Sequence, residues 1–319
     1  MSAAIDVVVP VHGHYELTRS CLQHLAKQTA AHHTIVVDDG SPDDSVVRLR
    51  SDWPDVRTIE LHVNEGYTRA VNHGVSAGSA EYVVLLNNDV ELRADCLERL
   101  VRPMEEDARI GSVAAVMLVR GGEAIDSIGV SADVTLAGFA RLQGHRAIGA
   151  ISPEPRLTGP EGTAGAYRRR AWEQAGGLDE HMRAYMEILD LALRLQSLGW
   201  STAAALDALG VHLGSSTYGR RSRTQRRLAA FSRGYLLRRY GVLRSSAWAR
   251  TLATETIVVG ADALLCRDLE AVLGRLEGWR AAGGLTRHPF PPAAAIASSI
   301  SLRESLNLRR GAVMARESP

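Results

Sequence analysis

The stretch VVLLNNDVEL, residues 83–92, runs four apolar residues straight into Asn87, Asn88 and Asp89. A continuous apolar run is typical of a strand that is buried on both faces of a parallel sheet. Ligands bind beyond the carboxyl ends of such strands. Short polar side chains at this point therefore either make a turn or face a ligand.

Outward from this strand, short apolar runs alternate with helix-length amphipathic segments over residues 5–89. This alternation predicts βαβ units on a parallel sheet, and hence an α/β fold. Polar residues follow the other predicted strands as well, at His12, Asp39 and Asn64. A turn would explain any one of these residues. Polar groups at all the strand ends together favour a polyanion or metal site.

The composition indicates a folded protein without a charge excess. The chain has 319 residues, 45% of them hydrophobic, and a formal charge of +1, so no nucleic-acid partner is expected. Its three cysteines lack metal-ligand spacing, which is typical of reduced thiols in the cytosol. We see no leader sequence and no long apolar span. These features predict a cytoplasmic protein, at most peripheral at the inner face of the membrane.

The C-terminal part has a different character. Residues 220–250 contain ten arginines and no acidic residue. Such a run is either a solvated helical face or a surface that approaches an anionic substrate or membrane headgroups. We expect a nucleotide-sugar-binding and catalytic domain at residues 1–218, an Arg-rich helical region at 219–288 and a mobile tail at 289–319. The long helices are a candidate homodimer contact.

Eight segments occur in the order known from one enzyme family. They are VVVPVHGH, VVDDGSPDDS, NEGYTRAVNHG, LLNNDVEL, GTAGAYRRRAW, GGLDE, EILDLALRLQSLGW and VHLGSS. Over residues 5–240 the chain thereby resembles the family 2 inverting nucleotide-sugar glycosyltransferases, nearest to the rhamnosyltransferase-like branch. The resemblance implies a GT-A fold, which is a Rossmann-like mixed, mainly parallel sheet flanked by helices, here with an α-helical C-terminal extension.

The resemblance also implies roles for the matching positions. Asp89 would bind a divalent metal, Mg²⁺ or Mn²⁺, and His212 would help to hold the metal or the diphosphate. Asp39 would accept a hydrogen bond from a ring N–H of the nucleotide base. The residues expected to bind the donor are Pro10, His12, Asp39, Gly66 and Asn88.

The expected general base is where the chain departs from the family pattern. Members usually read E-D-x-D-L, with the second acid as the base, and this position is Ile188 here. A positioned carboxylate is needed because an alcohol is a poor nucleophile. Glu187 is the expected substitute and Asp190 the next candidate, although Arg194 one turn later would neutralise Asp190. An amine acceptor, or a nucleotide-sugar-binding protein without catalysis, stays open.

The expected partners follow from the same resemblance. The donor would be a dTDP- or UDP-linked sugar, with rhamnose or another deoxy sugar as the first candidate. The acceptor would be a glycan, a lipid-linked intermediate or a small natural product. Arg168 and Arg169 lie where the family places acceptor and diphosphate contacts, with a solvated run as the alternative. A dinucleotide-binding oxidoreductase is disfavoured because PVHGHYEL lacks the G-x-G-x-x-G turn.

Overall fold

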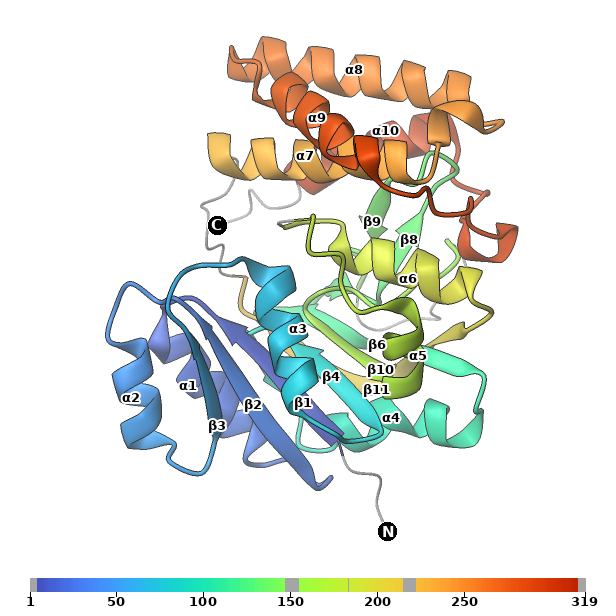
Figure 1. The fold of residues 1–319 in the computed structure, drawn as a ribbon. Coiled ribbons are helices and arrows are strands. Elements are labelled where there is room, and N and C mark those ends of the chain that lie inside the picture. The colour runs from blue at the N-terminus through green and yellow to red at the C-terminus, as the bar shows by residue number, and fades with distance from the viewer. Residues whose placement is uncertain (1–4, 147–154, 183, 215–221, 315–319) are drawn as a thin grey trace.

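A mixed nine-stranded sheet forms the centre of the computed structural model, which describes residues 5–146, 155–182, 184–214 and 222–314 (Figure 1). The strand order is β3-β2-β1-β4-β10-β6-β11-β5, with β7 beside β6. The strands are β1 (Ile5–Val11), β2 (His32–Asp39), β3 (Arg57–Leu61), β4 (Tyr82–Leu86), β5 (Val90–Leu92), β6 (Ile110–Val119), β7 (Ile125–Ser127), β10 (Ala164–Arg168) and β11 (Ser201–His212).

Helices cover both faces of this sheet, as the α/β pattern predicted. Apolar side chains of α1 (Tyr15–Leu25), α2 (Ser45–Asp52) and α4 (Cys96–Glu106) pack in one cluster on the first face. Those of α3 (Tyr67–Ala77), α5 (Arg169–Ala175) and α6 (Glu187–Ser197) pack on the other. The strands between them are buried on both sides, which explains their continuous apolar runs.

The N-terminal half of the sheet is parallel. β1 pairs in parallel with both β2 and β4, and β2 pairs in parallel with β3. Their carboxyl ends therefore meet at one edge, where the polar residues after each strand come together. The other half is mixed, because β10 runs antiparallel to β4 and β6 while β6 and β11 are parallel.

A short hairpin joins the sheet domain to the C-terminal helices. It consists of β8 (Val130–Ala132) and β9 (Gly138–Ala140). Val130 belongs to one buried cluster with Leu189 of α6 and Leu236 of α7. The hairpin therefore connects α6 of the sheet domain with α7 through apolar packing.

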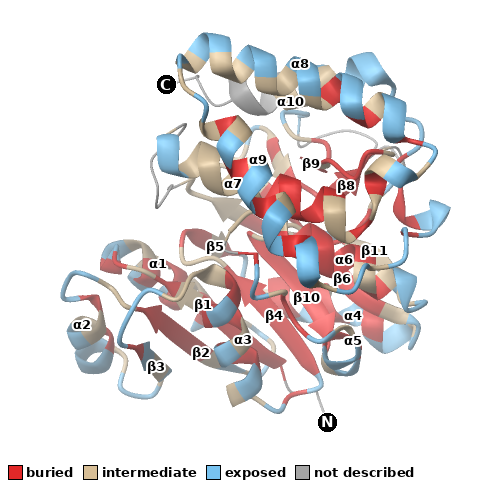
Figure 2. Ribbon diagram, turned by 45° about the horizontal axis from the view of Figure 1, so that its top comes forward, coloured by how far each residue is buried: buried red, intermediate tan, exposed pale blue. Residues whose placement is uncertain are grey.

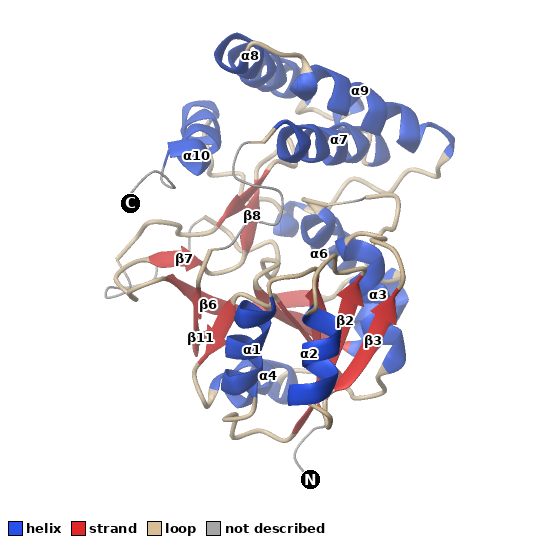
Figure 3. Ribbon diagram, turned by 90° about the vertical axis from the view of Figure 1, so that its left-hand side faces the viewer, coloured by secondary structure: helices blue, strands red, loops and turns tan. Residues whose placement is uncertain are grey.

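The C-terminal helices form a further layer above α6 (Figures 1 and 3). The layer comprises α7 (Arg223–Arg239), η1 (Val242–Arg244), α8 (Trp248–Cys266), α9 (Glu270–Ala281), η2 (Ala282–Gly284), η3 (Ala293–Ala295) and α10 (Leu302–Met314). α7 and α9 pack at very short distance, since a side chain at Gly278 would collide with the backbone of Phe231. None of the described helices is long and apolar enough to span a membrane.

Two expectations for this region do not fit the structure. Arginines of α7 do not form a bare cationic surface, because carboxylates of α8 and α9 and of the turn between them pair with them. The described part of the tail, residues 289–314, packs against the rest of the chain. Ala295, Ala297 and Ile300 are buried, and the Ser305 hydroxyl donates to Asp133 at 2.6 Å. The domain divisions at residues 218 and 288 stay predictions.

Candidate active site

A cavity of about 330 Å³ lies at the carboxyl ends of the parallel strands. It gathers residues from β1, β2 and β4 and from the start of α6. Its lining includes six of the expected site residues, namely Pro10, His12, Asp39, Asn88, Asp89 and Glu187. Tyr67, Glu161, Tyr185 and Gln225 also line it. Tyr67 lies within the quoted segment NEGYTRAVNHG, but sequence reasoning missed the other three, because they stand outside the eight segments.

Asp39 is held in place by backbone donors at one end of the cavity. Its carboxylate accepts from the amides of Glu65 at 2.6 Å and Gly66 at 3.0 Å. Gly66 has φ of 93°, a conformation that favours glycine. Burial raises the pKa of Asp39 despite these donors. Asp38, by contrast, receives the amide and hydroxyl of Ser41 and makes the turn after β2.

His12 lies beside Asp39 in the same wall. Its Nδ1 is 2.8 Å from the Asp39 carbonyl oxygen and 3.2 Å from Nδ2 of Asn64. These contacts fix the imidazole against the strand end. Asn88 also has a fixed amide, which donates to the Thr18 hydroxyl at 3.0 Å. The cavity therefore presents preorganised polar groups at two strand ends.

Asp89 and His212 meet although they are far apart in the sequence. The antiparallel register of β5 and β11 places His212 opposite Val90, one residue after Asp89. Nε2 of His212 lies 3.2 Å from Oδ2 of Asp89, and its Nδ1 lies 2.8 Å from Oδ2 of Asp126. Burial lowers the pKa of His212, but hydrogen bonds and charge from both aspartates outweigh it and raise the pKa to about 10.

These three side chains have the donor chemistry of a metal centre. A carboxylate oxygen and an imidazole nitrogen converge, and both are ligands that Mn²⁺ accepts. Asp126 on the far nitrogen would orient the ring, as outer-shell carboxylates do at many metal sites. Sequence reasoning missed Asp126 because it lies in the short strand β7, outside the eight segments that carry the family resemblance. The residues present therefore fit a divalent ion.

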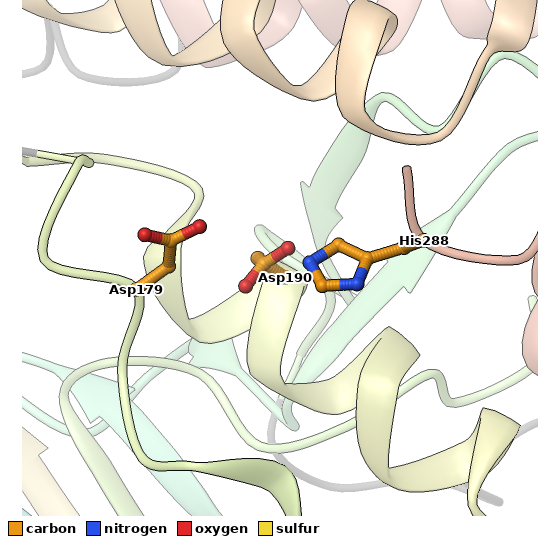
Figure 4. A group of neighbouring side chains, drawn as sticks. All are labelled: Asp179, Asp190 and His288. Atoms are coloured by element: carbon orange, nitrogen blue, oxygen red, sulfur yellow. The ribbon is translucent and has the colours of Figure 1, made fainter. Parts of the chain in front are cut away.

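A second Asp–Asp–His group lies beneath the helical layer (Figure 4). Potential ligand atoms of Asp179, Asp190 and His288 lie within 4.8 Å of one another. Basic and hydroxyl groups already occupy these positions, since Arg194 and Tyr240 bind the two oxygens of Asp190 at 2.8 and 2.9 Å. The expected pair of Asp190 with Arg194 is thus present. Through Tyr240, Asp190 also connects α6 to the end of α7.

Nε2 of His288 is likewise engaged, because a guanidinium nitrogen of Arg239 lies 2.8 Å away. Tyr235 donates to Asp179 at 2.7 Å. The cationic charge that a metal would bring to this group is already supplied by arginine. Asp89 and His212 are therefore the better candidates for metal ligands.

Glu187 is the carboxylate of α6 that faces the cavity. The residue is 9% exposed, and its Oε2 has no hydrogen-bond partner among the described residues. Burial, assisted by the charges of Glu161 and Asp190, raises the pKa of Glu187 to about 7. Tyr185 and Met186 before it both have left-handed φ, at 66° and 63°. Consecutive non-glycine residues in this conformation are costly and often occur at functional sites.

Arg168 and Arg169 are neither substrate contacts nor a solvated run. Arg168 pairs with Glu81 at 2.7 Å, and Arg169 pairs with buried Asp6 at 2.7 Å. Both side chains are largely buried in these pairs. They fasten β10 and α5 to the neighbouring strand ends, which the local sequence could not reveal because both partners are distant.

Comparison with known proteins adds to this geometry. The sequence profile of "Glycosyl transferase family 2" matches residues 6–174. The N-acetylglucosaminyl-diphospho-decaprenol L-rhamnosyltransferase of Mycobacterium tuberculosis is 26% identical over 213 residues, which cover 58% of this chain and 68% of that protein. Glycosyltransferase GlyG of Streptococcus pneumoniae is 30% identical over 112 residues, covering 33% of this chain and 36% of GlyG, so the chain aligns with only about a third of that relative.

Among solved structures, the mannosyltransferase PcManGT from Pyrobaculum calidifontis, in complex with GDP-Man and Mn²⁺, has a similar fold. The TM-score is 0.52 at 18% sequence identity, and the alignment covers 100% of this chain and 82% of that one. This likeness confirms the GT-A fold expected from the sequence.

Proposed function

Because the chain belongs to glycosyl transferase family 2, we propose that it transfers a sugar from a nucleoside diphosphate donor to a hydroxyl group of an acceptor. The observation that carries this proposal is the common cavity of Asp39, Asp89 and Glu187. Such a transfer needs a hydrogen-bond acceptor for the nucleotide base, a ligand for the metal and a carboxylate with a pKa near neutrality. Asp39, Asp89 and Glu187 are the respective candidates.

Donor binding would use the strand ends. The carboxylate of Asp39, fixed by the amides of Glu65 and Gly66, would accept the ring N–H of a uracil or thymine base. His12 and Pro10 would form the wall beside the base. Asn88 would reach a hydroxyl of the sugar or ribose. These roles favour a UDP- or dTDP-sugar, and rhamnose or another deoxy sugar is the first candidate.

Asp89 and His212 would hold Mg²⁺ or Mn²⁺, with Asp126 orienting the imidazole. Such an ion, when bound, neutralises charge on the departing diphosphate. The protein's own contribution is the fixed geometry of the two ligands, since β5 and β11 hold them on adjacent strands.

Glu187 would act as the general base. Its carboxylate takes the proton of the acceptor hydroxyl while the oxygen attacks the anomeric carbon. The bond from that carbon to the diphosphate breaks on the opposite side, so the configuration inverts. A pKa of about 7 suits this role, because about half of the carboxylates are then ionised at neutral pH and their basicity matches proton abstraction.

The acceptor is a hydroxyl-bearing glycan, a lipid-linked intermediate or a small natural product. The named relative from Mycobacterium tuberculosis points to the lipid-linked class. A protein that binds nucleotide sugars without catalysis would agree with Ile188 at the usual base position. Glu187 favours an enzyme instead, because it brings a carboxylate to the same cavity.

The test is turnover of a donor panel that includes dTDP-rhamnose and UDP-sugars, each with Mn²⁺ and with hydroxyl-bearing acceptors from the glycan, lipid-linked and natural-product classes. The release of nucleoside diphosphate is measured for the wild-type protein and for Glu187→Gln. We expect release from one donor class, reduced at least about a hundredfold in the variant. Tight donor binding without any release would support the non-catalytic alternative.

A further inference from the structure

Helix α8 presents apolar side chains to the outside and polar ones to the inside. Its buried residues are Thr251 and Thr254. Leu264 is 81% exposed, Leu265 75% and Trp248 54%. The helix lies at the outer edge of the molecule and is mostly coloured as exposed or intermediate in Figure 2. A surface helix of a globular protein normally turns its apolar side chains to the core and its polar ones to the solvent.

All three charged side chains within α8 point inward. Glu255 pairs with Arg233 at 2.9 Å and Arg275 at 2.7 Å. Asp262 pairs with Arg226 at 2.8 Å. Arg250 donates to the Ile300 carbonyl at 2.8 Å. The exposed residues from 252 to 265 therefore carry no charge at all.

The exposed residues of α8 recur in adjacent pairs every four positions, from Trp248 and Ala249 to Leu264 and Leu265. Rows with a spacing of four are the ridges by which two helices most often pack, crossing at about −50°. Gly260 lies on this face, and a Cβ added there would meet no described atom within 4 Å. Glycine in an exposed helix costs about 1 kcal/mol relative to alanine, and no contact within the chain requires it.

We propose that this face binds a second copy of the chain, with α8 packing across its counterpart around a two-fold axis near Thr256 and Ile257. When the two α8 helices run in opposite directions, large side chains of one face lie opposite small side chains of the other. Ala253 then faces the partner's Gly260, which allows a close approach at the centre, and Leu252 faces the partner's Ala261. The crossing angle separates the helix ends and leaves room there for Trp248 and Leu265.

The extent of the face suits such a contact. With 19 residues, α8 is roughly 28 Å long. Leu269 in the turn after α8 and Leu273 and Leu276 in α9 are exposed as well. An exposed face without charged side chains from residue 252 to 265 is typical of the buried core of a homodimer interface.

A membrane surface fits the same face less well. Helices that lie in a bilayer interface carry basic side chains beside their apolar face, to meet anionic headgroups. Arginines of α7 that could do so are held by acidic groups, since Arg226 pairs with Asp262 and Asp268, and Arg227 with Glu270 and Glu277. An uncharged face matches another uncharged face better.

The test is sedimentation velocity of the 319-residue chain from about 0.5 to 50 µM, a range that brackets common dimer affinities. We expect a concentration-dependent dimer for the wild type. Leu252→Glu buries a charge in the contact and should weaken dimerisation at least about thirtyfold. Gly260→Leu should weaken it as well while raising the melting temperature of the monomer, because a Cβ at this position meets no described atom within 4 Å and leucine has the higher helix propensity.

The matched control is Val47→Glu, at an apolar residue of α2 that is 70% exposed and outside the helical layer. It should dimerise like the wild type. A wild type that stays monomeric at 50 µM would overturn the proposal, and so would an unchanged dimer affinity in both α8 variants. Co-sedimentation of a monomeric wild type with vesicles of neutral and anionic phospholipid would assign the face to a membrane instead.

Discussion

Glu187 shows how one residue's surroundings decide its chemistry. The side chain is largely buried and lines the cavity, and its pKa is raised to about 7. Asp190, only three residues later, is bound by Tyr240 and Arg194. Two carboxylates in one helical turn therefore have different surroundings, since Glu187 faces the cavity and Asp190 is held by hydrogen bonds.

The pH dependence of activity should follow Glu187. As the pH falls below about 7, the carboxylate takes up a proton and can no longer accept one from the acceptor, so kcat/KM should fall about tenfold per pH unit. The pH–rate profile of the wild type checks this. The residual activity of Glu187→Gln should lack the limb near pH 7, and an identical limb in that variant would assign the titration to another group.

Glu187 should also destabilise the folded protein at alkaline pH. Its folded pKa lies above the ordinary value of 4.5, so folding binds a proton between pH 4.5 and 7, and stability falls as the pH rises through this window. Glu187→Gln should therefore raise the free energy of unfolding by about 1–3 kcal/mol at pH 8. Urea denaturation measures it, and the gain should shrink at pH 5. A loss of stability at pH 8 would contradict the expected cost of the buried charge.

Asp126 gives a prediction for the candidate metal centre. Asp126→Asn keeps the size of the side chain but removes the charge that orients His212. Mn²⁺ affinity, measured by calorimetry on the unliganded protein, should fall about 10–100-fold. Asp107→Asn, at an acid paired with Arg109 on the surface, is the control and should bind Mn²⁺ like the wild type. Equal affinity in all three proteins would place the metal elsewhere.

At the scale of elements, the contact between α6 and the end of α7 can be tested through the hydroxyl of Tyr240, which donates to Asp190. Tyr240→Phe removes the buried hydrogen bond to Asp190 and should cost about 1–3 kcal/mol of unfolding free energy. Tyr167→Phe is the matched control, because that buried hydroxyl has no hydrogen-bond partner among the described residues. Its loss should be neutral or stabilising. Chemical denaturation compares the two, and equal effects would contradict the role of the Tyr240 bond.

The elements of the N-terminal half were predictable from the sequence, because their periodicity is local. The apolar run at residues 83–86 read as a buried strand, and the polar residues after the predicted strands marked the cavity. Asp126 and the partners of Arg168 and Arg169 were not predictable in the same way. Each depends on a contact between distant segments, such as Arg169 with Asp6, for which a single sequence has no local sign.

At the scale of the whole molecule, the helices of the C-terminal layer are held to one another by ion pairs as well as by close packing. Glu255 binds three arginines from α7, α9 and α10, which keep its pKa well below the usual range. Composition alone suggested a cationic surface here. The carboxylates that neutralise it come from later helices, so the charge pattern became clear only in the folded chain.

Nucleotide binding tests the central claim most directly. The purified protein is titrated by calorimetry with UDP, dTDP, GDP and their sugars, each with and without Mn²⁺. We predict that a pyrimidine nucleoside diphosphate binds and that Mn²⁺ strengthens its binding. Asp89→Ala should remove the gain in affinity from Mn²⁺, and Asp39→Ala should weaken binding both with and without Mn²⁺. Failure of every nucleotide to bind, with or without Mn²⁺, would contradict the assignment of this cavity to a nucleotide-sugar donor.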